Sequence, residues 1–199
     1  MGQNALYMTA SDLSKVTLFA IEHPEQIPAM LGYAEQFRIA NPVYLALTPH
    51  VAYALSRSSI DHTVPEEYYS DEELNVLGLD LIEKVDIFVN DMTSVFRDMV
   101  PDVRGCQLDI GAIFWYEIKI LINSLAVKTY IFLQILKEVD VDAVCCFETD
   151  GEPLEPSLFF LDESVWSLVI SNACKIKQLR VDTLKKQKDW ASVRSKGII

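Results

Sequence analysis

The chain contains 199 residues, of which 50% are hydrophobic and 23% are charged, and its formal net charge is −12. This length and composition suit one well-packed globular core, or one domain with an appendage. The excess of acidic residues excludes a chain that is built as a whole to hold nucleic acid.

The first third of the chain alternates between short apolar runs and helix-like segments. The runs VTLFAI and VYLALT predict strands at 16–21 and 43–48, and a shorter run predicts a third strand at 61–64. Helices are expected between them, at 24–40 and 50–59, each with a proline near its first turn. This is the pattern of a parallel sheet wrapped by helices, in which the second strand lies between the first and the third and the crossovers are right-handed.

Two long helices are expected in the middle of the chain. Ser70 and Glu73 have the spacing of a capping box, which predicts a helix that runs, with a break near Gly78, to about Met99. Residues 110–139 are the most apolar helical segment, and we expect them to be buried on most sides between the sheet and another helix. The charged residues within this segment make it a poor membrane span.

The last third completes the pattern. A fourth strand is expected at 142–147, a short fifth strand at 157–161, a helix at 165–176 and a polar helix or tail over 180–196. Residues 175–199 carry eight Lys or Arg against two Asp. This basic segment is either a solvated helix or a peripheral contact with an acidic lipid surface, such as the inner face of the membrane, or with another domain.

Together these elements predict an α/β fold. We expect a Rossmann-like open parallel sheet of about four to six strands, flanked by helices and including the long buried helix 110–139. The predicted organisation is a loose N-terminal segment (1–14), a Rossmann-like domain (15–178) and a basic helix or linker tail (179–199).

The cysteines and the N-terminus indicate a compartment. Cys106, Cys145, Cys146 and Cys174 form no C-x-x-C pair, so the sequence predicts no zinc site. Cys145 and Cys146 lie inside an apolar run, as buried thiols of a reducing compartment do. The N-terminus has no basic-then-apolar secretion signal. These features predict a cytoplasmic protein.

Several kinds of chemistry are excluded by missing motifs. The seven glycines form neither G-x-G-x-x-G nor G-x-x-x-x-G-K, which excludes dinucleotide and phosphate-loop sites of those types. No G-x-S-x-G nucleophile elbow is present. The sequence also lacks a receiver-type aspartate at the end of its first or third strand. No metal site and no resident cofactor are predicted.

The candidate site is the edge of the sheet beyond the carboxyl ends of the strands, where open parallel sheets bind ligands. Three segments should meet there: Glu22-His23, Thr48-Pro49-His50 and the loop that holds Glu148 and Asp150. Helix N-termini behind the two histidines favour an anionic ligand group, and histidine is suited to general-base catalysis. The alternative is that the histidines are surface residues at helix starts and that the acidic loop is merely solvated.

Three phrases carry a resemblance to a known family. "YLALTPHVAYAL", "DHTVPEEYYSDEEL" and "LFFLDESVWSLVIS", with the order of elements, make residues 15–175 resemble the N-terminal part of bacterial surface-carbohydrate biosynthesis proteins. Those proteins look like relatives of the two-domain GT-B glycosyltransferases. The chain has no Gly-rich loop after its first strand, in contrast to the better-known members.

The resemblance implies an acceptor-side domain that is not active on its own. A sugar or glycan acceptor would bind to it, and a nucleotide-sugar donor would be held mainly by a C-terminal domain that is missing here. In inverting members the base commonly follows an early strand, which makes His23 and Glu22 the catalytic candidates. Thr48, His50, Glu148 and Asp150 would then contact the ligand.

Two other interpretations stay open. The chain is alternatively a non-catalytic α/β binding or interaction module that presents the acidic segment 66–102 to a partner protein. The third interpretation is a stand-alone enzyme that acts on a small molecule, with the sheet edge that carries the histidines and glutamates as its site.

Overall fold

The structure, a computed structural model, describes residues 16–99, 110–148 and 165–185. Within them lies a parallel sheet of four strands in the order β2-β1-β3-β4. The strands are β1 (Val16–Ile21), β2 (Asn41–Ala46), β3 (Ala143–Phe147) and β4 (Arg180–Leu184). The predicted α/β class with an open parallel sheet flanked by helices is therefore confirmed.

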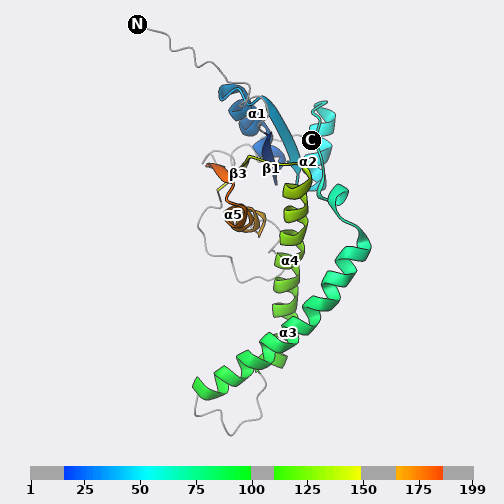
Figure 1. The fold of residues 1–199 in the computed structure, drawn as a ribbon, viewed down its shortest axis with the longest axis vertical. Coiled ribbons are helices and arrows are strands. Elements are labelled where there is room, and N and C mark those ends of the chain that lie inside the picture. The colour runs from blue at the N-terminus through cyan, green and yellow to red at the C-terminus, as the bar shows by residue number, and fades with distance from the viewer. Residues whose placement is uncertain (1–15, 100–109, 149–164, 186–199) are drawn as a thin grey trace, which may run out of the picture.

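Helices connect and extend this sheet (Figure 1). They are η1 (Pro24–Gln26), α1 (Ile27–Gln36), α2 (Pro49–Arg57), η2 (Pro65–Tyr68), α3 (Asp71–Met99), α4 (Ile110–Glu138) and α5 (Val165–Lys177). The predicted helices at 24–40, 50–59, 110–139 and 165–176 correspond to η1 with α1, α2, α4 and α5. The predicted fifth strand at 157–161 lies outside the described residues.

The sheet separates two apolar cores, because successive strand residues point to opposite faces. Phe19 of β1 and Cys145 of β3 belong to the core under α1 and α2. Leu18 and Val144, their neighbours in sequence, belong to the core under α4 and α5. Helices thus cover both faces, and the side changes where the strand order reverses, between β1 and β3. Crossovers of a single hand produce this arrangement.

Two predicted strands differ in extent from the observed ones. β2 begins at Asn41 and ends at Ala46, because Thr48 is already the N-cap of α2. The third predicted strand, 61–64, is reduced to a parallel bridge between Thr63 and Leu45. Thr63 makes both backbone hydrogen bonds to the sheet, and Pro65 then starts η2 and has no N–H to extend the ladder. The predicted neighbours of the second strand are nevertheless correct.

The prediction of a polar helix or tail over 180–196 is wrong for its first residues. Arg180–Leu184 form β4, which pairs with β3 along all five of its residues. β4 is the edge strand of the sheet, and an edge strand tolerates charged side chains on its open side. The rest of that segment from residue 186 lies outside the described residues.

The start of α3 follows the predicted capping box. The backbone N–H of Ser70 donates to Glu73 Oε2 at 2.9 Å, and the N–H of Glu73 donates to Ser70 Oγ at 3.3 Å. The hydrogen bond from Ser70 lowers the pKa of the Glu73 carboxyl. The predicted break near Gly78 does not occur, since α3 runs without interruption to Met99.

The long helix α4 is confirmed, but its predicted burial holds for one end only. All of its buried hydrophobic side chains in the described part of the chain lie between residues 131 and 136, in the core under α5. Toward its N-terminus, Ile113 and Phe114 are exposed. Ile113–Glu138 is long and apolar enough to cross a membrane by length and composition alone. The buried end shows that packing against the sheet explains part of this apolar character.

We call α3 and α4 together the arm, because they extend away from the sheet and cross each other near their far ends (Figure 1). Gly111 marks their closest approach. Its N–H donates to Thr93 Oγ1 at 2.8 Å, and one turn further on Trp115 Nε1 donates to Asp86 Oδ1 at 2.6 Å. A Cβ atom on Gly111 would collide with the side chains of Thr93 and Val89 and would lie 2.6 Å from the Val89 carbonyl oxygen.

This close approach predicts opposite effects for two glycine-to-alanine substitutions. Gly111→Ala is expected to lower the free energy of unfolding by about 1–3 kcal/mol, because the helices must move apart. Gly32→Ala, in α1, should raise it by about 0.5–1 kcal/mol, since nothing lies within 4 Å of its added Cβ and alanine favours helix. Urea unfolding curves of both variants measure the difference. Equal stabilisation by both would show that α3 and α4 do not touch at Gly111.

Three cysteines are described, and all three are buried free thiols: Cys145, Cys146 and Cys174. Burial raises the pKa of Cys145 and Cys146 to about 12 and that of Cys174 to about 11. These side chains are therefore neutral core residues at any physiological pH. Cys106 lies outside the described residues.

Candidate functional site

The strand ends that were predicted to form a site do lie together. The N–H of Leu47 donates to the carbonyl oxygen of Ile21 at 2.8 Å, and Thr48 Oγ1 donates to the carbonyl oxygen of Glu22 at 3.0 Å. These bonds continue the pairing of β1 with β2 past the last strand residues. They fix the chain after each strand, and so the starting points of η1 and α2, side by side.

Each of the two turns is also stabilised from within. The amide oxygen of Gln26, a buried side chain, accepts hydrogen bonds from the N–H groups of Glu22 at 2.8 Å and His23 at 3.2 Å. Thr48 caps α2, because its Oγ1 accepts a hydrogen bond from the N–H of Val51 at 3.4 Å. The backbone that carries Glu22, His23 and His50 is thus held at several points.

A cavity of about 490 Å³ opens over these turns, within the usual size range of small-molecule sites. It is bounded by the ends of β1 and β2, by η2, by one turn of α4 and by the start of α5. Its lining residues are Glu22, His23, Pro24, Leu47, Thr48, Pro49, His50, Pro65, Glu66, Tyr69, Val127, Lys128, Ile131 and Trp166.

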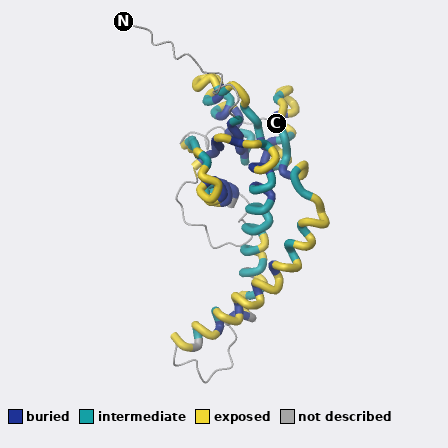
Figure 2. Tube along the Cα trace, in the orientation of Figure 1, coloured by how far each residue is buried: buried dark blue, intermediate teal, exposed yellow. Residues whose placement is uncertain are grey.

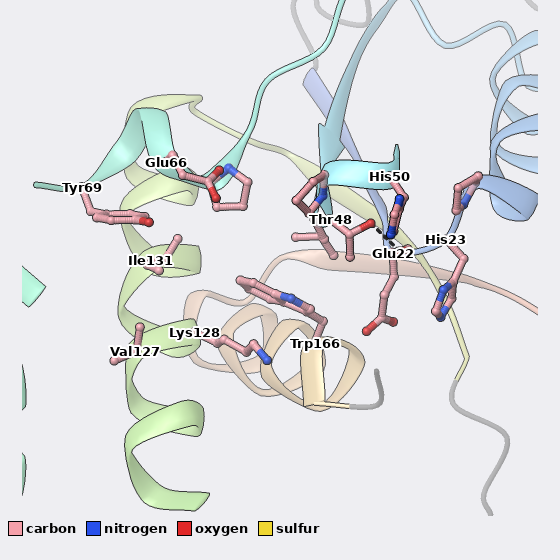
Figure 3. A pocket seen from close by; sticks show the side chains of 14 residues that line it. Glu22, His23, Thr48, His50, Glu66, Tyr69, Val127, Lys128, Ile131 and Trp166 are labelled. Carbon is pink, nitrogen blue, oxygen red and sulfur yellow. Dashed lines mark hydrogen bonds between the residues drawn. The ribbon is translucent and has the colours of Figure 1, made fainter. Parts of the chain in front are cut away.

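The walls of the cavity differ in character (Figure 3). Glu22, His23 and His50 lie on one side, and Tyr69, Val127 and Ile131 on the other, with Trp166 and Lys128 between them. The cavity therefore combines a polar, titratable wall with an aromatic and aliphatic wall.

The charge of Lys128 and the protonation of Tyr69 are influenced by neighbouring groups. Lys128 Nζ lies 5.7 Å from the centre of the Trp166 ring, within the range of a cation–π contact. Burial, and then the nearby charges of Glu66 and Asp71, raise the pKa of Tyr69. The Tyr69 hydroxyl therefore stays protonated and can donate a hydrogen bond at neutral pH.

Four of the six residues predicted from the sequence line this cavity: Glu22, His23, Thr48 and His50. Glu148 is described but is not among the lining residues; it is exposed, and its N–H donates to the carbonyl oxygen of Leu184 at 2.8 Å. Glu148 directly follows β3, and its backbone pairs with the end of β4. Asp150 lies outside the described residues.

The prediction missed the residues that helices contribute, above all Lys128, Tyr69 and Trp166. One signal was available for Lys128, which is a rare charge on an otherwise apolar stretch of α4. No signal in the sequence placed Trp166 beside β1, because that contact depends on how α5 packs on the sheet.

The described residues contain no group of three or more His, Cys, Asp or Glu that is placed to hold a metal ion. No known protein family, curated protein or solved structure matches the chain. The function is therefore argued from the cavity itself.

Proposed function

We propose that the cavity binds a sugar and that the chain is the acceptor-side domain of a GT-B-like glycosyltransferase of surface polysaccharide biosynthesis. The observation that carries this proposal is the pairing of Trp166 with carboxylate and imidazole side chains across one cavity of about 490 Å³. A sugar ring has an apolar face of C–H groups and a rim of hydroxyls. An indole ring suits the face, and carboxylates accept hydrogen bonds from the rim.

The position of the cavity supports the same proposal. It lies beyond the carboxyl ends of β1 and β2, where open parallel sheets bind their ligands. Its open side would face a second Rossmann-like domain that carries a nucleotide-sugar donor. A mixed lining of Lys128, glutamates and a protonated Tyr69 suits a polar, hydroxyl-rich ligand better than an apolar one.

The proposed reaction assigns a role to the residues after β1. An acceptor hydroxyl attacks the anomeric carbon of the donor, the bond from that carbon to the nucleoside diphosphate breaks, and the hydroxyl proton must leave. His23 is the proposed general base, and Glu22 would hold the acceptor hydroxyl or share the proton. His50 and Thr48 would orient the ring from the end of β2.

Sugar binding is tested by the fluorescence of Trp166. The chain has three tryptophans, so Trp115→Phe with Trp190→Phe leaves Trp166 as the only reporter. Neutral hexoses, N-acetylhexosamines, hexuronic acids and hexose phosphates are titrated up to millimolar concentration. At least one of these should change the emission of Trp166 in a saturable manner, because the ring lines the cavity.

Two matched glutamates, three positions apart, provide the control. Glu22→Gln should weaken binding about tenfold or more, since a hydrogen bond to a charged group is lost. Glu25→Gln should leave the affinity unchanged, because Glu25 does not line the cavity. A chain that binds none of these sugars contradicts the proposal and favours the non-catalytic interaction module.

A further inference from the structure

The arm carries an unusual concentration of exposed apolar side chains (Figure 2). Eleven of the fifteen exposed large hydrophobic residues in the described part of the chain lie on it. They are Val76, Leu79, Ile82, Ile87, Phe88, Val95 and Met99 on α3 and Ile113, Phe114, Tyr116 and Ile120 on α4. Exposed apolar surface on this scale marks an interaction site.

Three of these residues form one side of α4. Ile113, Tyr116 and Ile120 follow each other at spacings of three and four, so they lie one above the other on the helix surface. They are 54%, 63% and 36% exposed. Gly111 and Trp115, through which α4 contacts α3, each stand two positions from Ile113, which is about half a helical turn. Ile113, Tyr116 and Ile120, which we call the α4 face, therefore lie on the side of α4 opposite α3.

Burial within the chain does not account for the apolar character of α4. Ile113–Glu138 has the length and composition of a helix that crosses a membrane, yet 17% of its most apolar stretch is buried inside the protein. The positions of Glu117 and Lys119 fall on either side of the α4 face, and two charges so near to it oppose a helix that spans the bilayer. A helix with an apolar face between charged flanks lies in the surface of a bilayer instead.

We propose that the α4 face lies on the surface of a lipid bilayer. Ile113 and Ile120 would contact the acyl chains, and the ring of Tyr116 would lie at the level of the headgroups, where tyrosine is enriched in membrane proteins. This inference does not depend on the proposed sugar site.

The charges of the two arm helices support lipid as the occupant. α4 carries three Lys against two Glu, whereas α3 carries eight Asp or Glu against Lys84 and Arg97. Because α3 lies on the opposite side of α4 from the α4 face, its acidic side chains stay in water when the face meets a bilayer. A zwitterionic surface does not repel a chain of net charge −12, in contrast to an acidic lipid surface or a second copy of the chain.

The α4 face also continues into the cavity. Val127 and Ile131 stand seven and eleven positions after Ile120, so they lie on the same side of α4, and both line the cavity. A bilayer that covers the α4 face therefore comes close to the cavity as well.

Vesicle flotation tests the proposal on the full chain. The wild-type chain should float with vesicles of pure phosphatidylcholine. Ile113→Asp should raise the apparent dissociation constant for these vesicles about tenfold or more, because it places a charge at the apolar boundary.

The same substitution on α3 is the matched control. Ile87 is 56% exposed and stands two positions from Val85 and Val89, the buried residues on the side of α3 that meets α4. It thus lies far from the α4 face, and Ile87→Asp should bind the vesicles as the wild-type chain does. Ile120→Asp should weaken binding as Ile113→Asp does, and circular dichroism verifies that each variant is folded.

Four results would overturn the proposal. The first is a wild-type chain that does not float with phosphatidylcholine vesicles, whether or not it self-associates. The second is flotation of both Ile113→Asp and Ile120→Asp with wild-type affinity. The third is an equal loss of binding in Ile87→Asp. The fourth is binding that requires phosphatidylglycerol and survives Ile113→Asp, which would place the contact in the basic segment 175–199.

Discussion

Replacing Ile135 by alanine is expected to lower the free energy of unfolding by about 2–5 kcal/mol, the usual cost of emptying a buried isoleucine site. Ile135 has no exposed surface and belongs to the core between the sheet and α5. The neighbouring Phe132 is equally inaccessible, so the cavity left by the substitution is bounded by well-packed side chains. Urea unfolding followed by circular dichroism gives the free energy of each variant.

The matched control is the same substitution on the same helix. Ile113 is 54% exposed near the other end of α4, and Ile113→Ala should change the free energy of unfolding by less than about 0.5 kcal/mol. The contrast tests whether α4 is a core helix at one end only. Equal, large losses for the two variants would mean that α4 is buried along its whole length.

The parallel sheet was predictable because its strands are short apolar runs. β1 was predicted with its observed bounds, and β3 differs by one residue. Both are almost completely buried, since helices cover both faces of the sheet, and such strands appear in a sequence as runs without alternation. β4 was missed for the converse reason: as an edge strand it contains Arg180 and Asp182, which contact each other at 3.0 Å.

The end of α1 was predicted four residues too late, because no glycine marks it, whereas the ends of α2, α4 and α5 were predicted within two residues. Four non-glycine residues that follow helices have φ between 50° and 56°: Arg38, Ser59, Asp140 and Gln178. This left-handed conformation normally favours glycine. After α1, the N–H of Ile39 then reaches back to the carbonyl oxygen of Ala34 at 2.9 Å and closes the helix. The predicted helix therefore ran past Gln36 to residue 40.

The partial exposure of α4 could not be predicted from its composition. A helix that is apolar on all sides predicts burial on all sides. In the structure, the sheet and α5 cover one end of α4, and α3 contacts the other end.

The candidate site was predictable where it depends on topology alone. Residues that directly follow neighbouring parallel strands must meet at one edge of the sheet, which is why Glu22 and His50 line the same cavity. Glu148 follows a strand too, but β3 lies on the far side of β1 from β2, and the backbone after it turns toward β4. The missing information was that β3 also pairs with β4, which the sequence analysis did not predict as a strand.

His23→Ala is expected to have the largest effect on the proposed reaction. In the proposed transferase, assembled with a donor-binding domain, loss of His23 as the proposed general base should lower the rate of transfer about a hundredfold to ten-thousandfold. The free energy of unfolding should change little, because the His23 side chain lines a cavity and the turn itself is held by the Gln26 amide oxygen.

The affinity for the acceptor separates catalysis from binding in the same variant. A base acts in the transition state, so His23→Ala should reduce kcat with little change in the dissociation constant of the acceptor. His50→Ala is the matched control from the neighbouring strand end: it should weaken acceptor binding and leave most of kcat. Normal transfer by His23→Ala would exclude His23 as the base. Glu22, which lines the same wall of the cavity, would then be the remaining candidate for the base. Parallel losses of binding and turnover in both histidine variants would instead assign both residues to holding the acceptor.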